Sequence, residues 1–240
     1  RCRRRHWLRY VARVPEPEHR GSEAALISAV QRGQIVHEVL ERLDEEAQLA
    51  DLLEIAIGRW DESAPPPDSD SGRRYREHLR DEIERVLQHP DYKELFDQPG
   101  VRKELGFAYV HGDGVSALGS IDLAAPGPDG LRMLDVKTTQ CDADAVDAKA
   151  KQYAPQRDVY VTAAGAIAGL PVDWFAFQFS RAAAHVRQTL DAAARNRARQ
   201  AFEAAARAVG SGRMDLTEHP EECWFCGYRR VGLCPGAKAS

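Results

Sequence analysis

Two short polar clusters in the middle of the chain constrain its fold more than any other feature. Gly-Ser-Ile-Asp at 119–122 ends one apolar segment, and Asp135-Val136-Lys137 lies thirteen residues further on, inside another. Residues two apart on a strand point to the same side, so this spacing places two carboxylates and an ammonium at one edge of a hairpin. Two such carboxylates repel each other unless a hard cation lies between them. The pattern predicts a metal site with a lysine beside it, although an Asp-x-Lys triplet alone is more often part of a surface hairpin.

Polar residues at three other places extend this pattern. His37 lies among apolar residues with helical spacing (Ile35, Val36, Val39, Leu40 and Leu43), and Glu104 opens the apolar stretch 105–110. Tyr153, Gln156 and Tyr160 fall on a later helical segment, where residues four apart share a face. The order along the chain is therefore His, Glu, Asp, Asp-x-Lys and Tyr-x-x-Gln-x-x-x-Tyr.

In this order the chain resembles the RecB-type branch of the PD-(D/E)xK nuclease superfamily, from Cys2 to Pro235. The resemblance implies that a catalytic Mg²⁺ or Mn²⁺ is held by His37, Asp122, Asp135 and the Val136 carbonyl. It also implies that Lys137 assists the attacking water, and that Gln156 and Tyr160 support the site and contact DNA.

Four residues of the pattern keep alternative interpretations. Glu104 holds either an outer water or a second metal, or it is an exposed carboxylate at a strand start. Gln156 and Tyr160 are either site residues or a solvent-facing amide beside a core tyrosine. Tyr153 is a candidate to stack on a base.

Five cysteines provide separate information. Cys223-x-x-Cys226 and Cys234-Pro235 supply three thiolates at a spacing typical of metal ligands, so one ligand is missing locally. By resemblance to the iron-sulfur members of this family, which include AddB-like helicase-nucleases and the nucleases of CRISPR adaptation, Cys2 completes a [4Fe-4S] cluster. A zinc site with four thiolates is the alternative, and unligated thiols are another. Cys141 is expected to be a free thiol in the loop after the catalytic strand.

Composition agrees with a soluble enzyme. The 240 residues are 43% hydrophobic and 29% charged, with no apolar run of membrane-spanning length, so we expect a cytoplasmic protein with no membrane partner. The net charge of −4 argues against bulk attraction to nucleic acid, whereas the arginines near the N-terminus could bind phosphates locally. Trp7, Trp174 and Trp224 are expected in the core or around the cluster.

Hydrophobic periodicity predicts helices at 22–60, 75–88, 145–168 and 187–208, and strands at 104–111, 116–123, 131–138 and 174–180. We therefore expect an α/β fold in which a mixed central sheet is flanked by helices, as in the restriction-endonuclease-like PD-(D/E)xK core. An iron-sulfur staple would join the N- and C-terminal segments. We expect one domain over 1–240, with an N-terminal helical part (1–95), a catalytic core (about 100–180) and a C-terminal helix with a cysteine tail (187–240).

The function expected from the resemblance is a metal-dependent DNA exonuclease that acts on single strands or duplex ends in DNA repair and recombination. It would serve as the nuclease module of a helicase-nuclease. No phosphate-binding Gly-x-x-x-x-Gly-Lys-Ser/Thr motif is present, so a helicase motor would lie elsewhere. The alternatives are a stand-alone nuclease of CRISPR adaptation and a catalytically silent, cluster-stapled DNA-binding module.

Overall fold

A computed structural model describes most of the chain. The described residues are 2–6, 8–9, 12, 14–15, 23–44, 48–112, 114–211, 223 and 226–235. They divide into two compact units, one formed by 25–109 and 117–202 and the other by 1–24, 110–116 and 203–240. Trp7, Trp224 and residues 22 and 45–47 of the first expected helix lie outside the described residues.

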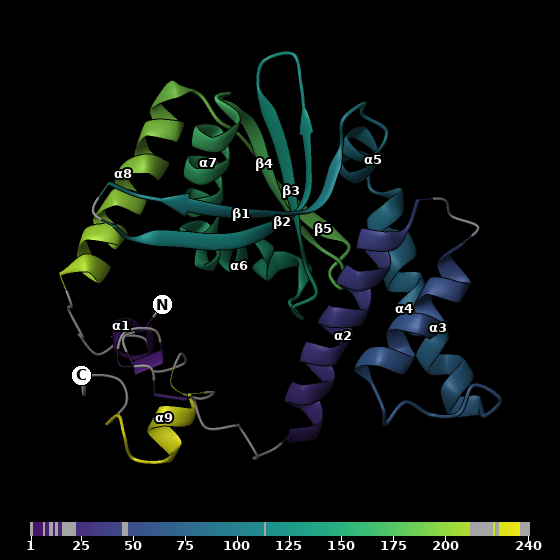
Figure 1. Cartoon of the computed structure of the whole chain (residues 1–240). Helices are drawn as coiled ribbons and strands as arrows, with labels where there is room; N and C mark the ends of the chain where they lie inside the picture. The colour runs from purple at the N-terminus through teal and green to yellow at the C-terminus, as the bar shows by residue number, and fades with distance from the viewer. Residues whose placement is uncertain are drawn as a thin grey trace. The chain divides into compact units, whose positions relative to one another are not determined.

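The larger unit is built around a five-stranded sheet with strand order β1-β2-β3-β4-β5 (Figure 1). The strands are β1 (Arg102–Val110), β2 (Ser116–Pro126), β3 (Leu131–Lys137), β4 (Val172–Phe179) and β5 (Ala184–Thr189). β3 runs antiparallel to β2 and parallel to β4, and β5 returns antiparallel to β4. The sheet is mixed, as expected, and its parallel pair needs a crossover connection, because parallel neighbours cannot be joined by a tight turn.

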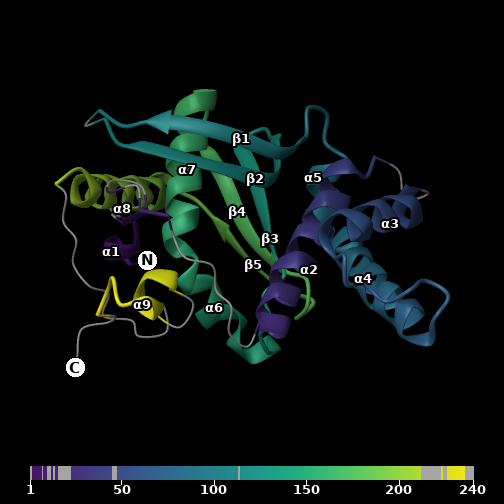
Figure 2. The same ribbon diagram turned by 60° about the horizontal axis from the view of Figure 1, so that its bottom comes forward.

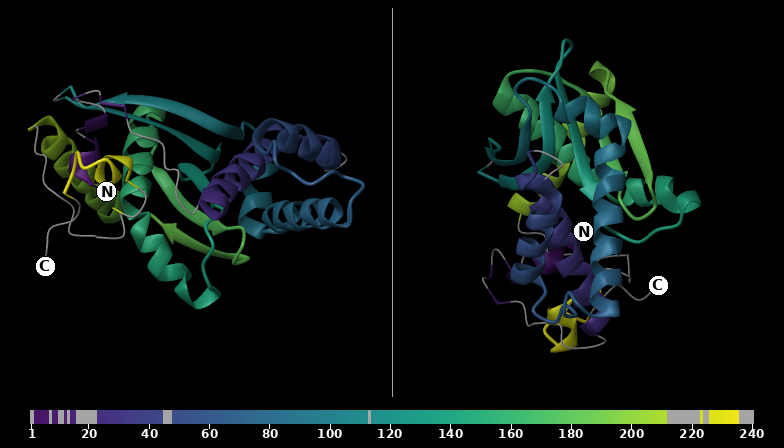
Figure 3. Two further views of the ribbon diagram at one scale, coloured as in Figure 1. Left: turned by 90° about the horizontal axis from the view of Figure 1, so that it is seen from below. Right: turned by 90° about the vertical axis from the view of Figure 1, so that its right-hand side faces the viewer.

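Helices cover both faces of this sheet (Figures 1 and 3). One face packs against α2 (Glu23–Arg42), α3 (Leu49–Trp60), α4 (Asp70–Gln88) and α5 (Pro90–Phe96). The other face packs against α6 (Val146–Gln152), α7 (Ala154–Ala168) and the first part of α8 (Ala192–Gly210), while a 3₁₀ turn, η3 (Ala143–Ala145), precedes α6. The crossover from β3 to β4 therefore consists of η3, α6 and α7.

The alternation of side chains along β3 decides where its polar residues point. Leu134 and Val136 pack into the cluster on the α2–α5 face, and Met133 packs into the cluster on the α6–α8 face. Because successive side chains alternate between faces, Asp135 and Lys137 point toward the α6–α8 face. This is the face that α7 covers.

Four of the observed elements differ from those expected. The expected helix 22–60 is two helices, α2 and α3. The expected helix 145–168 is divided at Tyr153, because Pro155 lies in the first turn of α7, a position that favours the start of a helix. A short helix, α5, follows the turn at His89-Pro90. The prediction of a C-terminal helix from 187 was wrong over its first residues: β5 occupies 184–189, and α8 begins at Ala192.

The smaller unit brings the two ends of the chain together. It contains α1 (Arg3–His6) and α9 (Gly227–Arg230), which lie side by side in Figures 1 and 2. The Tyr228 hydroxyl donates a 2.6 Å hydrogen bond to the Val14 carbonyl, and Leu8 packs with Tyr228, Cys226 and Cys234. No helix among the described residues is both long and apolar enough to cross a membrane.

A buried carboxylate connects the helices of the α2–α5 face to the end of β3. Glu82 on α4 is only 1% exposed, and it accepts hydrogen bonds from Ser180 Oγ at 2.5 Å and from Arg32 Nη1 at 3.0 Å. The Ser180 amide in turn donates to the Lys137 carbonyl at 3.1 Å. Glu82 therefore ties α2 and α4 to the strand end that carries Lys137.

We predict that Glu82→Ala lowers the free energy of unfolding by about 3 kcal/mol, because it leaves Arg32 and Ser180 without their buried partner. Urea unfolding of the two proteins measures this difference. As a control, Arg73→Ala removes only exposed contacts, an ion pair with Asp70 and a hydrogen bond to the Asp68 carbonyl, and should change stability by less than about 0.5 kcal/mol. Equal losses in the two variants would contradict the connecting role of Glu82.

Candidate active site

The candidate site lies where β2 stops pairing with β3. The paired register runs from Leu123 opposite Leu134 to Pro126 opposite Leu131. Just before it, Asp122 Oδ2 accepts a 2.5 Å hydrogen bond from the Val136 amide. The carboxylate thus binds a backbone amide of the neighbouring strand and is fixed beside Asp135 and Lys137. Adjacent strands bring the two aspartates together, as the sequence predicts.

His37 on α2 completes a group of three potential metal ligands. Its Nδ1 lies 3.4 Å from Asp122 Oδ1 and 3.5 Å from Glu104 Oε1. Among the described residues, these three side chains are the group of His, Cys, Asp or Glu whose donor atoms all lie within 4.8 Å of one another. Glu104 is therefore part of the site's geometry rather than an isolated carboxylate at a strand start.

The backbone at Glu104 is strained. Its φ of 44° lies in the left-handed region, which a residue with a side chain rarely adopts. Ser120 Oγ donates a 2.7 Å hydrogen bond to Glu104 Oε2 and helps to hold the carboxylate toward His37. Strain of this kind persists only where surrounding contacts fix it, and it is concentrated at functional sites.

Lys137 and Asp135 are held together by Gln156. Lys137 Nζ lies 2.5 Å from Asp135 Oδ2 and donates to Gln156 Oε1 at 2.9 Å. The Gln156 amide nitrogen donates to Asp135 Oδ1 at 3.2 Å and to the Tyr160 hydroxyl at 2.6 Å. One side chain of α7 therefore fixes both members of the Asp-x-Lys pair, and Tyr160 fixes that side chain in turn.

The ring of Tyr153 also contacts the ammonium of Lys137. The ammonium of Lys137 lies 4.7 Å from the centre of the Tyr153 ring and 5.6 Å from that of Phe177. The Tyr153 hydroxyl is 2.8 Å from Thr139 Oγ1, and its ring also packs against Phe179. These contacts give Tyr153 a positioning role, by a cation–π interaction with Lys137.

Each residue of the 119–122 segment has a distinct task in this arrangement. A Cβ on Gly119 would lie 2.8 Å from the Phe107 ring and 3.2 Å from Tyr160, so only glycine lets these two rings approach. Ser120 binds Glu104, Ile121 is fully buried in the core, and Asp122 enters the site. Gly33 allows α2 to approach the residue after β3 closely, because a Cβ at Gly33 would lie 3.1 Å from Thr138 Oγ1.

The charges of the site shift its pKa values. Burial alone would lower the pKa of His37, but its hydrogen bonds with Asp122 and Glu104 outweigh this effect and raise the pKa to about 10. The same contact with His37 lowers the pKa of Glu104. Burial and the nearby Asp122 raise the pKa of Asp135 to about 7, against the opposing effect of Lys137. Burial raises the pKa of Tyr160 to about 12.

This donor set fits a divalent cation. One imidazole and two carboxylates suit Mg²⁺ or Mn²⁺, which prefer oxygen ligands and retain waters. Asp135 Oδ2 is fully buried, and apart from its ion pair with Lys137 it accepts no well-formed hydrogen bond. His37, Glu104 and Asp122 would hold the ion, and Asp135 with the Val136 carbonyl remains a predicted addition to them.

The sequence did not reveal the supporting residues Gly33, Ser120 and Thr139. A glycine four residues before His37 in a helical pattern is a weak signal of close packing. The other two are ordinary hydroxyl residues whose partners come from distant strands and helices, so no local pattern could have shown their roles.

The mixed sheet presents Asp122 and Asp135-x-Lys137 on adjacent strands, beside a group of potential ligands for a divalent metal. The chain belongs to the PD-(D/E)XK nuclease superfamily, whose family model matches residues 1–235. No curated protein matches the chain. Membership confirms the superfamily expected from the motif order, and implies a nuclease that uses a divalent metal such as Mg²⁺ or Mn²⁺ and acts on DNA.

We predict that metal binding at this site releases a proton from His37, because a ring nitrogen must be neutral to bind a metal. At pH 8.5, His37 with its pKa of about 10 is still protonated, whereas Asp135 with its pKa of about 7 is already ionised. Calorimetric titration with Ca²⁺ in two buffers of different ionisation enthalpy should show release of about one proton per ion. Affinity should rise with pH up to about 10.

The matched variant is His37→Gln, which should bind Ca²⁺ more weakly and release no proton. A binding heat for the unaltered protein that does not depend on the buffer would show that His37 is not a ligand.

Proposed function

We propose that this chain is a RecB-type nuclease of the iron-sulfur branch. In this proposal it is an Mg²⁺- or Mn²⁺-dependent exonuclease of the cytoplasm that hydrolyses phosphodiester bonds in single-stranded DNA or at duplex ends. It acts in DNA repair and recombination as the nuclease module of a helicase-nuclease. The order of the site residues along the chain supports this branch of the superfamily.

The observation that carries the proposal is the shared hydrogen bonding of Gln156 with Asp135, Lys137 and Tyr160. A catalytically silent member of this fold would not need to keep its lysine and aspartate in this fixed contact. Here both are present and held, and the ligand group of His37, Glu104 and Asp122 lies on the neighbouring strands and helix. The contacts therefore favour an enzyme over a silent DNA-binding module.

Each side chain then has a chemical task. A divalent cation in this site would polarise the scissile phosphate and lower the pKa of a bound water. The ammonium of Lys137 faces the same edge and can orient the attacking water or stabilise negative charge on the phosphate. Gln156 and Tyr153 hold that ammonium in place from two sides. Hydrolysis forms a bond from the water oxygen to phosphorus and breaks the bond from phosphorus to a sugar oxygen.

The cysteines of the smaller unit support a [4Fe-4S] cluster on Cys2, Cys223, Cys226 and Cys234. All four are free thiols, and the last three are buried. Burial raises the pKa of Cys223, and the neighbouring Cys2, Cys226 and Cys234 raise it further, so the four thiols lie near one another. Cys141 packs instead against the core of the larger unit.

The separation of the cysteines along the chain favours a cluster over zinc. Zinc modules usually take their ligands from short stretches of sequence, whereas 220 residues separate Cys2 from Cys223.

We predict that Asp122→Asn and Lys137→Ala each lower the rate of DNA cleavage at least about 100-fold, the usual contribution of a metal ligand or of a proton-transfer group. The assay uses end-labelled single-stranded and duplex DNA with Mg²⁺, Mn²⁺ or EDTA, and EDTA should abolish cleavage. Lys93→Ala, which removes an exposed lysine of α5, is the control and should cleave normally. Full activity of Asp122→Asn would refute the assigned site, and release of internal fragments first would refute the exonuclease.

We also predict that protein purified without oxygen is brown and contains about four iron and four sulfide per chain, as a [4Fe-4S] cluster requires. Cys226→Ser and Cys2→Ser should both lose the colour and melt earlier, since a ligand is lost from the same cluster. Cys141→Ser should keep both properties. Colourless protein with one zinc per chain would reject the cluster and leave the nuclease assignment untouched.

A further inference from the structure

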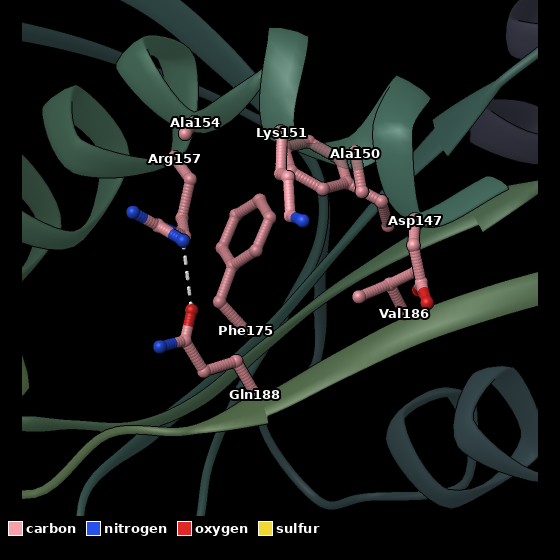
Figure 4. A pocket seen from close by; sticks show the side chains of 9 residues that line it. Asp147, Ala150, Lys151, Ala154, Arg157, Phe175, Val186 and Gln188 are labelled. Atoms are coloured by element: carbon pink, nitrogen blue, oxygen red, sulfur yellow. Dashed lines mark hydrogen bonds between the residues drawn. The ribbon is translucent and has the colours of Figure 1, made fainter. Parts of the chain in front are cut away.

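The last strand, β5, divides its side chains between the two faces of the sheet. Val186 and Gln188 point toward the α6–α8 face, where they line a small cavity with residues of α6 and α7 (Figure 4). Because successive side chains of a strand alternate, His185 and Arg187 point toward the α2–α5 face. There Arg187 Nη1 donates to Asp91 Oδ1 at 2.8 Å, so this side of β5 is bound to α5.

His185 also contacts a second histidine, which lies just before α5. His89 Nε2 is 2.9 Å from His185 Nδ1, and the two rings meet edge to face with their centres 4.3 Å apart. His89 caps α5, because its Nδ1 accepts a 3.2 Å hydrogen bond from the Asp91 amide. On the other ring, His185 Nε2 lies 3.7 Å from Asp91 Oδ2. The contacts of this histidine pair, His89 and His185, therefore begin and end at Asp91.

The cap determines which nitrogen of each neutral ring carries the proton. His89 Nδ1 accepts the Asp91 amide, so the proton of His89 is on Nε2. That Nε2–H donates to His185 Nδ1, and His185 therefore also carries its proton on Nε2, facing the Asp91 carboxylate. Each of the four ring nitrogens is directed at one partner, and none is free to take a second proton.

A further proton must therefore break one of these contacts. A proton on His89 Nδ1 meets the Asp91 amide, and a proton on His185 Nδ1 meets the Nε2–H of His89. The charged groups around the pair are Asp91 and Glu94 of α5 and Arg187 of β5, and Arg187 is bound to both carboxylates. Burial and the charge of His185 lower the pKa of His89, and Asp91 opposes this effect only in part.

We propose that the histidine pair is a proton-sensitive latch that joins α5 to the edge strand β5. In its neutral form the pair holds the start of α5 against β5. Uptake of one proton breaks the bond between the rings, and His185 then binds Asp91 Oδ2, a buried atom with no hydrogen-bond partner among the described residues. α5 packs against β3, so the latch acts on a helix behind the strand of the candidate site. The proposal does not depend on the nuclease activity.

The latch should make the protein less stable in acid. In the unfolded chain these histidines take up protons below a pH of about 6.5, whereas the lowered pKa of His89 keeps the folded pair neutral to a lower pH. The stability that the pair contributes is therefore present above about pH 6.5 and is lost as the pH falls toward the pKa of folded His89. His37 and Asp135 also have shifted pKa values, so the contribution is measured as a difference between proteins that differ only in the pair.

The first test compares melting temperatures at pH 7.5 and pH 5. His89→Asn keeps a side-chain oxygen that can cap α5 but loses the nitrogen that reaches His185. At pH 7.5 it should melt about 2 to 4 °C earlier than the unaltered protein, the shift expected for one hydrogen bond in a chain of this size. At pH 5 it should melt no earlier, because the bond is then broken in both proteins.

Two further variants separate the bond from the charge. His185→Asn keeps an acceptor in the place of Nδ1 but cannot be protonated, so at pH 5 it should melt later than the unaltered protein. His78→Asn removes an exposed histidine of α4 outside the pair and should match the unaltered protein at both pH values.

Two measurements on the unaltered protein do not depend on how the variants fold. Nitrogen-15 spectra of the imidazole rings at pH 7.5 should show His89 and His185 both protonated on Nε2. In hydrogen exchange, the amides of α5 should lose about 10-fold in protection factor between pH 7.5 and pH 5, whereas those of α3 should not.

Three results would overturn the proposal. The first is a proton on Nδ1 of His89 at pH 7.5. The second is a melting difference between His89→Asn and the unaltered protein that is the same at both pH values. The third is an α5 whose protection in acid is unchanged, because the two rings would then be adjacent without joining the helix to the strand.

Discussion

The candidate site depends on the cost of keeping the Asp135 carboxylate away from water. Asp135 is only 2% exposed and lies beside a second carboxylate, Asp122. A buried charge of this kind is tolerated only with partners that compensate for lost hydration. Lys137 supplies the opposite charge and Gln156 a hydrogen bond, yet the pKa of Asp135 is still raised to about 7. A divalent cation would relieve the remaining repulsion, and this supports the proposal of a metal site at this strand edge.

The crossover from β3 to β4 places the compensating groups. A parallel strand pair requires a long connection, and here that connection contains α7, which starts at Ala154 after the break at Tyr153. Because the helix begins there, Gln156 is in its first turn and reaches both Asp135 and Lys137, and Tyr160 lies one turn later. The topology that builds the sheet is therefore also what orients the lysine.

The sequence allowed the three strands around the site to be predicted, because β1, β2 and β3 are separated by turns rich in Gly, Pro and Asp. It also correctly placed Lys137 beside Asp135, since residues two apart share a face. The face of the sheet to which the Asp122 side chain points could not be predicted from strand alternation. Ile121 and Ala124 pack into the same cluster although they are three residues apart, so the alternation is interrupted at Asp122. β5 was missed because its residues Ala-His-Val-Arg-Gln-Thr contain only two strand formers, Val186 and Thr189, and are followed closely by an Ala/Arg-rich helix.

The smaller unit shows why the cysteines matter physically. Four of its described buried side chains, Leu8, Cys226, Tyr228 and Cys234, form a cluster with Val14 packed against them. Small units usually need a metal or a disulfide, because a small apolar core does not by itself offset the loss of chain entropy. The hydrogen bond from Tyr228 to Val14 brings the two ends of the chain together, but one bond contributes only about 1 kcal/mol. In the proposed cluster, iron–thiolate bonds from residues on both ends would stabilise this unit, so the role that we propose for it is structural.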